Sequence, residues 1–275
     1  MKETDCGPGI HSIPEERYFA AAGVSKSDLD VIAEKTPAHL KAKRDGFEIE
    51  EETPAMKFGT VLHRALLEPD TYKNAFHVRP LETKFNTKNG KQWLREHDDG
   101  KPILTHRESL TIVAMVDAVY SHPFARRLLS DAIPEQSIFV IDQNDTLRKS
   151  RIDVPIKGNV IPDIKTCESA SLDNFERMIS RYRYHVQAAY YIDNCKLAGI
   201  DKSVFFFIAV EKSPPYAVRC LQLDDTSIEI GRTLYQRDLQ IYRNCVESGI
   251  WPAWEDSFTT ASLPAWEMRK MEMAA

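Results

Sequence analysis

The sequence predicts a mixed α/β (α+β) fold in which helices flank a mixed central β-sheet. Two observations carry this prediction. From residue 105 onward the hydrophobic pattern runs in the order helix, three strands, helix, strand, and a further strand and helix follow. Residues 203–211 (SVFFFIAVE) are almost continuously apolar, which is typical of a strand buried inside a sheet. Helices packed on a sheet are the architecture that accommodates both patterns.

The region before residue 105 is predicted to be a helical elaboration of that core. Residues 25–44 have helical character, and Pro37 should divide them into two short helices. A serine at their start, Ser25 or Ser27, can act as the N-cap. Residues 58–67 repeat apolar side chains at helical spacing and form the next expected helix.

A polar stretch at residues 80–102 separates these helices from the core. It contains five basic side chains: Lys84, Lys88, Lys91, Arg95 and Lys101. Such a loop, or loop with a short helix, is a candidate contact for a DNA backbone, and a merely solvated loop fits the same composition. Residues 105–130 then predict a helix or helix pair that breaks near Pro123.

Three strands follow. Residues 137–142, 146–156 and 160–167 have the composition of strands, and the turn-forming residues 143–145 and 157–159 separate them. We therefore expect an antiparallel meander whose strands are joined by two hairpins.

The C-terminal half of the core predicts two helices and two strands. Residues 171–198 form a long helix that can be interrupted near residues 182–184. The buried strand 203–211 is followed by a strand at 216–223 and by an amphipathic helix at 224–247.

The third predicted strand carries the most informative residues. Side chains alternate along a strand, so Asp163 and Lys165 project to one face and Ile164 to the other. Asp153 lies on the preceding strand and can face the same point across a hairpin. Two converging carboxylates favour a divalent cation between them, and oxygen ligands suit Mg²⁺ or Mn²⁺. A surface ion pair on a strand is the alternative interpretation.

Four further residues are candidates for the same site. Gln187 and Tyr191 are four apart on the following helix and share one face, although Tyr190 and Tyr191 also fit as core aromatic residues. His63, on the helix at 58–67, can bring an imidazole to a metal, and a lone histidine on a helix is otherwise structural or exposed. Glu135 precedes the first strand and is either a further acid of the site or a solvated residue.

The chain resembles the RecE-type exonucleases (exodeoxyribonuclease VIII), prophage enzymes of the PD-(D/E)xK nuclease superfamily. The resemblance covers about residues 24–254. It rests on four motifs in order, SKSDLDVIAEKTPAHL, GTVLHRALLEPDTY, RIDVPIKGNVIPDIKT and YRYHVQAAYY. One departure is that Ile152, instead of proline, precedes Asp153, whereas Pro162 precedes Asp163.

The resemblance implies a processive exonuclease that digests linear double-stranded DNA from the 5′ end with Mg²⁺ or Mn²⁺. The 3′ single strand would pass to an annealing protein of the RecT type for recombination. The implied metal ligands are His63, Asp153, Asp163 and Glu135. The implied catalytic residues are Lys165, Asp163, Asp153, Gln187 and Tyr191.

The family also implies a homo-oligomeric ring around the DNA. Basic residues would then line the channel of an otherwise acidic protein, whose formal net charge is −5. The candidates for DNA contact are Lys84, Lys88, Lys91, Arg148, Lys149, Arg151, Arg181 and Arg183.

The domain organisation follows from these motifs. We interpret residues 1–275 as a single exonuclease domain, with a helical N-terminal elaboration (1–104), a nuclease core with its C-terminal helix (105–255) and a tail (256–275). Five scattered cysteines without a CxxC pair, together with the lack of any long apolar segment, predict a soluble cytoplasmic protein.

Two alternative functions fit much of the same sequence. One is a catalytically inactive DNA-end-binding protein on the same fold, which the intact Asp153, Asp163 and Lys165 disfavour. The other is an endonuclease or repair nuclease with this core, although no additional sequence-reading module is evident. A hydrolase of small phosphorylated molecules ranks last, because the sequence contains neither a Walker-type loop nor an HExxH motif.

Overall fold

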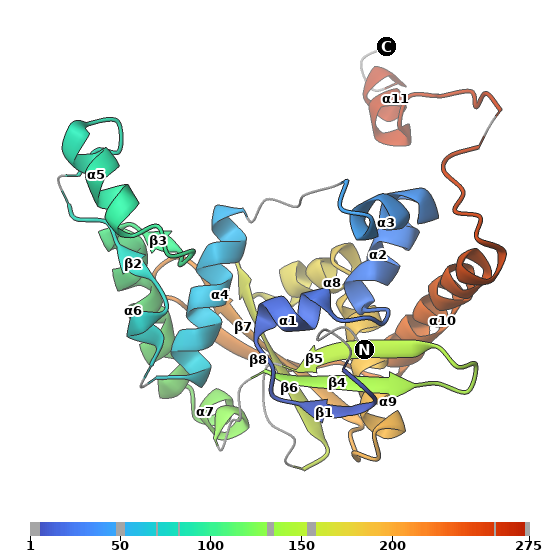
Figure 1. Ribbon diagram of the computed structural model, residues 1–275, viewed down its shortest axis with the longest axis horizontal. Helices are drawn as coiled ribbons and strands as arrows, with labels where there is room; N and C mark the ends of the chain where they lie inside the picture. Colours follow the sequence, from blue (N-terminus) through green and yellow to red (C-terminus); the bar gives the residue numbers. More distant parts are fainter. Residues whose placement is uncertain are drawn as a thin grey trace.

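The protein is described by a computed structural model at residues 6–47, 53–69, 71–81, 83–130, 135–152, 158–255 and 257–272. Helices and strands mix along the chain, and helices surround small sheets (Figure 1). The predicted α+β class is therefore confirmed. Over these residues the strands are divided among three small sheets, whereas the sequence suggested one continuous sheet.

The most buried sheet contains β6 (Val160–Cys167), β7 (Val204–Glu211) and β8 (Val218–Gln222). β7 lies in the middle, parallel to β6 and antiparallel to β8. Its apolar run is buried on both faces, as predicted. β6 is one of the two edge strands of this sheet within the described residues.

A second sheet contains β4 (Gln136–Ile141), β5 (Leu147–Ile152) and β1 (Gly9–His11). β4 and β5 form the predicted antiparallel hairpin. β1 pairs antiparallel with the outer edge of β4, and this pairing was not predicted from the sequence.

The prediction of a three-stranded meander was wrong in its third member. In the described part of the chain β6 pairs in parallel with β7, not with β5. α8 (Leu172–Arg181) and α9 (Tyr184–Leu197) connect β6 to β7, and a helical crossover of this length suits parallel pairing. Most of the segment between β5 and β6, residues 153–157, lies outside the described residues.

Three helices cover one face of β6 and β7: α4 (Pro54–Leu67), α6 (His106–Ser121) and α7 (Pro123–Leu129). Together with Ile164 of β6 and Ile208 of β7 they form one hydrophobic core. The predicted break near Pro123 is confirmed, since this proline opens α7. α4 begins four residues earlier than the apolar pattern at 58–67 suggested, with Pro54 in its first turn.

The opposite face packs against α8, α9 and α10 (Asp225–Ser248), and α2 (Lys26–Glu34) and α3 (Pro37–Arg44) extend this second core. The division of residues 25–44 at Pro37 is confirmed. Ser25 caps α2 through a reciprocal capping box with Asp28.

Two backbone features fix α9. Arg183, between α8 and α9, has the left-handed φ of 53° and produces the predicted interruption. Gly231 of α10 lies against the start of α9, where a Cβ atom would come within 2.1 Å of the carbonyl oxygen of His185. The two helices therefore approach each other more closely than any side chain would allow.

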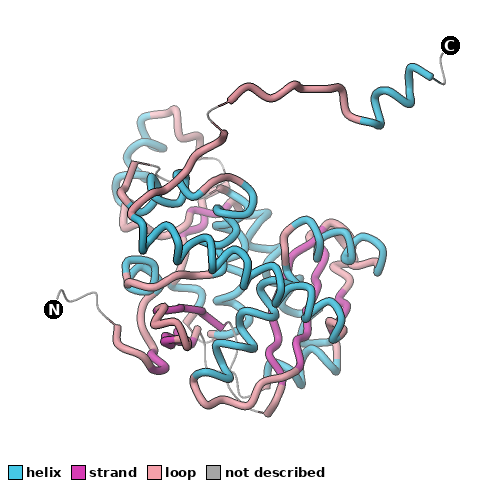
Figure 2. Tube along the Cα trace, turned by 90° about the vertical axis from the view of Figure 1, so that its right-hand side faces the viewer, coloured by secondary structure: helices cyan, strands magenta, loops and turns pink. Residues whose placement is uncertain are grey.

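Several small elements complete the chain. They are α1 (Glu15–Ala20), η1 (Tyr72–Asn74), β2 (His77–Val78), α5 (Lys88–Glu96), β3 (Ile103–Leu104) and α11 (Ala265–Glu272). Figure 2 shows α11 standing away from the body at the end of an extended segment. No helix over the described ranges is long and apolar enough to cross a bilayer.

Candidate active site

Two side chains of β6 form the centre of the site. Asp163 and Lys165 project to one face of the strand, while Ile164 between them packs into the core on the other face. Asp163 is only 2% exposed, and the Nζ atom of Lys165 lies 2.9 Å from its Oδ2 atom. The amine offsets much of the cost of burying the carboxylate. The strand thus brings together the acid and the lysine in the arrangement expected from their spacing.

α9 contributes two side chains to this pair. The Nε2 atom of buried Gln187 donates a hydrogen bond of 2.8 Å to Oδ1 of Asp163. The Tyr184 ring lies 4.7 Å from the ammonium of Lys165 and also contacts the ring of Phe207. Burial raises the pKa of Tyr184, so a neutral ring faces the cation. Gln187 orients the acid, and Tyr184 packs over the lysine.

α4 reaches β6 from the other side of the strand. The Nε2–H group of His63 donates to the carbonyl oxygen of Ile164 at 3.2 Å. Because β6 is an edge strand in the described part of the fold, this carbonyl can accept a bond from a helix. His63 is therefore beside the backbone that joins Asp163 to Lys165.

Two other predicted residues, Tyr191 and Glu135, have different surroundings. Tyr191 lies one turn beyond Gln187, half-buried against the core of α8–α10. Glu135 directly precedes β4 and forms an ion pair with Arg151. Asp153 lies outside the described residues. Within those that are described, no three His, Cys, Asp or Glu side chains form a metal-binding group.

Four of the eight candidate DNA contacts have partners inside the protein. Arg148 is 4% exposed, and its guanidinium lies 4.5 Å from the Tyr190 ring and 5.0 Å from the Tyr235 ring. Buried Lys149 donates to the carbonyl oxygens of three residues: Tyr18, Phe19 and Ala21. These contacts fasten the N-terminal segment to β5.

The other two occupied candidates are Arg151 and Arg183. Arg151 binds Glu135 and the carbonyl oxygen of Ile13. Arg183 lies between the carboxylates of Asp30 and Asp238. The four candidates that remain exposed are Lys84, Lys88, Lys91 and Arg181.

Two further residues, Tyr184 and Lys26, lie near the lysine and were not predicted from the sequence. The sequence offered a weak indication for Tyr184, since it lies three positions before Gln187 on the same helix. No sequence feature pointed to Lys26. Its Nζ atom lies 2.6 Å from Oδ2 of Asp30 and donates to the carbonyl oxygen of Tyr182. Burial lowers the pKa of Lys26, and the charge of nearby Lys165 acts in the same direction, against the opposing effect of Asp30.

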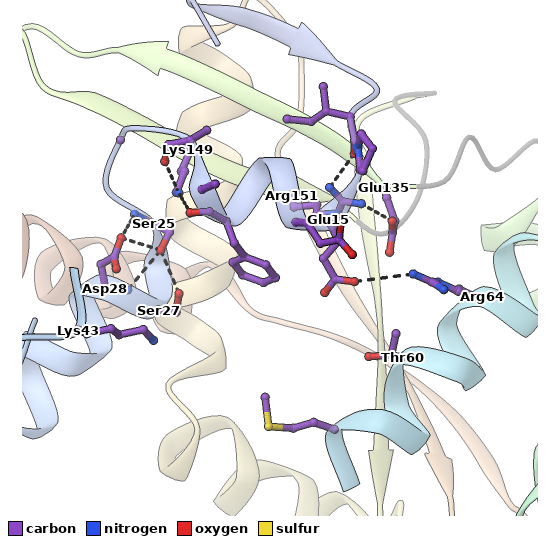
Figure 3. A pocket seen from close by; sticks show the side chains of 18 of the residues that line it. Glu15, Ser25, Ser27, Asp28, Lys43, Thr60, Arg64, Glu135, Lys149 and Arg151 are labelled. Carbon is purple, nitrogen blue, oxygen red and sulfur yellow. Dashed lines mark hydrogen bonds and ion pairs between the residues drawn. The ribbon is translucent and has the colours of Figure 1, made fainter. Parts of the chain in front are cut away.

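A large cavity of about 2010 Å³ lies beside α4, the helix that carries His63 (Figure 3). Its walls include α1, α2, α4 and the loop at residues 99–102. Thr60 and Arg64, which flank His63 on α4, line it, as do Asp30 and Glu135. Asp163, Lys165 and Gln187 are not among the described residues that line it. Its volume exceeds that of a typical small-molecule site, about 300–1,000 Å³.

Comparison with solved structures indicates the fold. A candidate exonuclease of Eubacterium rectale matches with a TM-score of 0.65 and 12% identity, over 94% of this chain and 98% of that protein. A phage-related exonuclease of Haemophilus somnus 129PT matches with a TM-score of 0.34 and 14% identity, over 83% and 97% of the two chains. At these identities the first match supports a shared fold. No curated protein matches the sequence.

The family comparison extends over most of the chain. Residues 25–257 match the model of a PDDEXK-like domain of unknown function (DUF3799). The matched range contains the acid and lysine of β6 and the glutamine of α9, which the structure places in contact. The chain therefore belongs to the DUF3799 family of PDDEXK-like domains, whose fold is that of PD-(D/E)xK nucleases.

Proposed function

We propose that the protein is a metal-dependent exonuclease that acts on the ends of linear double-stranded DNA. The observation that carries the proposal is the contact of Asp163 with both Lys165 and Gln187, on the strand and helix where the family motifs lie. A buried acid beside an amine, together with a large open cavity beside α4, suits hydrolysis of a polymeric phosphodiester better than binding of a small metabolite.

Each residue of this group has a distinct role in the proposal. Lys165 holds the attacking water and supplies positive charge where the scissile phosphate becomes more negative. Tyr184 limits the lysine to one orientation by packing against its ammonium. Gln187 fixes the plane of the Asp163 carboxylate through Oδ1, which leaves Oδ2 directed towards the lysine.

The residues present fit a divalent cation. The Oδ2 atom of Asp163 is buried and accepts no hydrogen bond in the described part of the chain, although it pairs with Lys165. A carboxylate oxygen, the Ile164 carbonyl and the His63 imidazole offer oxygen and nitrogen donors close to one strand edge. Asp153 completes the proposed set from outside the described residues. Bound there, Mg²⁺ or Mn²⁺ would stabilise charge on the phosphate and acidify water.

The finer features of the activity come from the resemblance to RecE-type exonucleases. They are processive 5′-to-3′ digestion, a 3′ single-stranded product for recombination, a ring-shaped homo-oligomer and an annealing partner of the RecT type. The size of the cavity supports a strand-sized substrate but does not distinguish the two polarities.

The test uses linear duplex DNA labelled at the 5′ or the 3′ end, with Mg²⁺, beside a covalently closed circle and an EDTA control. Early release of the 5′ label with an intact circle is the expected result. Cutting of the circle would indicate an endonuclease, and no cutting with Mg²⁺ or Mn²⁺ would favour a DNA-end-binding protein. Lys165→Gln, purified in the same way, controls for contaminating nucleases.

A further inference from the structure

The segment around α5 projects from the molecule, and its base is anchored by Leu104 of β3, which is buried in the core beside α4 and α6. We call residues 77–81 and 83–104, which comprise β2, α5 and β3, the α5 finger. In Figure 1 it stands at one end of the molecule, beyond α4 and α6. Lys88, Lys91 and Arg95 recur on α5 at intervals of three and four residues, so they lie on one face. All three are exposed, and none forms an ion pair with another described residue.

The helix that carries this row of cations is rigidly held. A Cβ atom on Gly90 would lie 2.0 Å from the carbonyl oxygen of Lys84, so the helix packs directly on the preceding loop. On the same side Trp93 stacks between Phe85 and His97, with ring centroids 6.1 Å and 4.0 Å away. The cations are therefore preorganised on a packed helix, which reduces the entropy lost when they bind a partner.

The base of the α5 finger borders the cavity. His77 of β2 hydrogen-bonds to Asp99 at 2.9 Å, and residues 99–102 line the cavity together with Thr60 and Arg64 of α4. A polymer that occupies the cavity would thus continue past the α5 finger.

We propose that the α5 finger holds double-stranded DNA by its phosphate backbone while an end of that DNA is in the active site. The proposal rests on the proposed function, since it takes DNA as the substrate. Lys88 to Arg95 spans roughly 10 Å at about 1.5 Å per residue. Phosphates follow one another every 3.4 Å or so along each strand of a duplex, so the row faces about three of them.

The structure favours duplex over single-stranded DNA as the ligand. Proteins that bind single strands offer exposed aromatic side chains on which bases stack. On the α5 finger Trp93 and Phe85 stack on each other instead, and the outward face carries cations. Cationic side chains that contact only phosphates do not read the bases. The proposed contact is therefore independent of DNA sequence.

The test compares two triple variants with the same loss of charge. The finger variant is Lys88→Ala with Lys91→Ala and Arg95→Ala. The control variant is Arg126→Ala with Lys196→Ala and Arg219→Ala, three exposed positions outside the α5 finger. Binding to a blunt duplex is measured by fluorescence anisotropy with EDTA, which prevents cleavage, at several salt concentrations.

We expect the finger variant to bind duplex DNA at least about 10-fold more weakly and the control variant to bind normally. The slope of log affinity against log salt should fall by about 2–3 in the finger variant only, because each lost phosphate contact contributes about 0.9. Replacing Lys88 and Lys91 by arginine should preserve binding. Circular dichroism verifies that α5 remains folded, which alanine favours.

Several outcomes would overturn the proposal. They are unchanged duplex affinity in the finger variant, an equal loss in the control variant, a loss confined to single-stranded DNA, and a change of oligomeric state without a change in DNA affinity. Failure of the proposed function is separable from these. If the wild-type protein binds duplex DNA through Lys88, Lys91 and Arg95 but cuts no DNA, the proposed nuclease activity is refuted. The proposed role of the α5 finger in DNA binding would still stand.

Discussion

Strands β5 and β6 both carry charged side chains, but they use them differently. On β5, Arg148 lies among tyrosine rings, while Lys149 donates to three backbone carbonyls of the N-terminal segment. On β6, Asp163 and Lys165 are paired with each other, and the acid is also bound by Gln187. The charges of β5 therefore connect parts of the fold, whereas those of β6 form a compact group.

The difference shows that burial alone does not identify a functional charge. Both strands contain charged groups below a tenth exposed, Arg148 and Lys149 on one and Asp163 on the other. What differs is the partner. Backbone carbonyls and aromatic rings cannot change protonation state under ordinary conditions, but an amine beside a carboxylate can exchange protons with water and substrate. Substitutions on β5 should therefore alter stability, and substitutions on β6 should alter rate.

The largest effect is expected from Lys165→Gln. The amide keeps a donor near Asp163 but cannot carry the charge or the proton, so the cleavage rate should fall by about 10³-fold or more. The melting temperature should fall modestly, because the amide still donates a hydrogen bond to the buried carboxylate but no longer offsets its charge. Single-turnover cleavage and thermal unfolding measure the two effects. A fully active variant would show that Lys165 has no role in the cleavage reaction.

Arg148→Ala is the counterpart on β5. It removes a buried side chain packed against Tyr190 and Tyr235, which should lower the free energy of unfolding by about 2–4 kcal/mol. Cleavage per folded molecule and affinity for DNA should remain those of the wild type. Arg148→Met fills most of the volume and should recover much of the stability. A loss of DNA affinity at unchanged stability would contradict the assignment.

A smaller effect is expected from Gln187→Ala. It removes the hydrogen bond to Oδ1 of Asp163, and a bond to a charged group contributes about 1.5–3 kcal/mol. The rate should therefore fall by roughly 10- to 100-fold, with KM nearly unchanged, because the amide is buried and positions the acid. Gln240→Ala, an exposed glutamine on α10, is the control. Equal kinetics for both variants would show that Gln187 serves only in packing and does not position Asp163 for the reaction.

The smallest effect concerns pH and His185, beside the site on α9. Burial lowers the pKa of His185 below 6.5, Arg183 and Lys26 add to this, and the hydrogen bond with the Ile179 carbonyl opposes it. The unfolded chain then takes up a proton before the folded one, so stability should decline as the pH falls below about 6.5. His185→Gln should flatten this decline in urea titrations. An identical pH profile would exclude His185 as its source.

Local patterns predicted the parts of the site that lie within one element. The alternation of Asp163, Ile164 and Lys165 required only that β6 be a strand, and Gln187 required only a helix at the right distance. Pro37 and Pro123 similarly marked helix breaks, because proline acts on its own neighbours.

The features that could not be predicted from the sequence depend on contacts between distant segments. Strand periodicity does not encode which strand will pair with β6, and the pairing with β7 follows from a crossover of two helices. The internal acceptors of Lys149 on β5, such as the Tyr18 carbonyl, are more than a hundred positions away in sequence. Composition reports the charge of a residue but not the partner that satisfies it.

The contact between Gly231 and the His185 carbonyl has a consequence for motion. With no side chain between them, α9 and α10 cannot slide past each other without a backbone collision. They should open to solvent as one unit, so their amide protons should be among the last to exchange with heavy water. Gln187 is then carried by the slowest-exchanging part of the molecule, whereas α11, which stands apart from the body in Figure 2, should exchange at once.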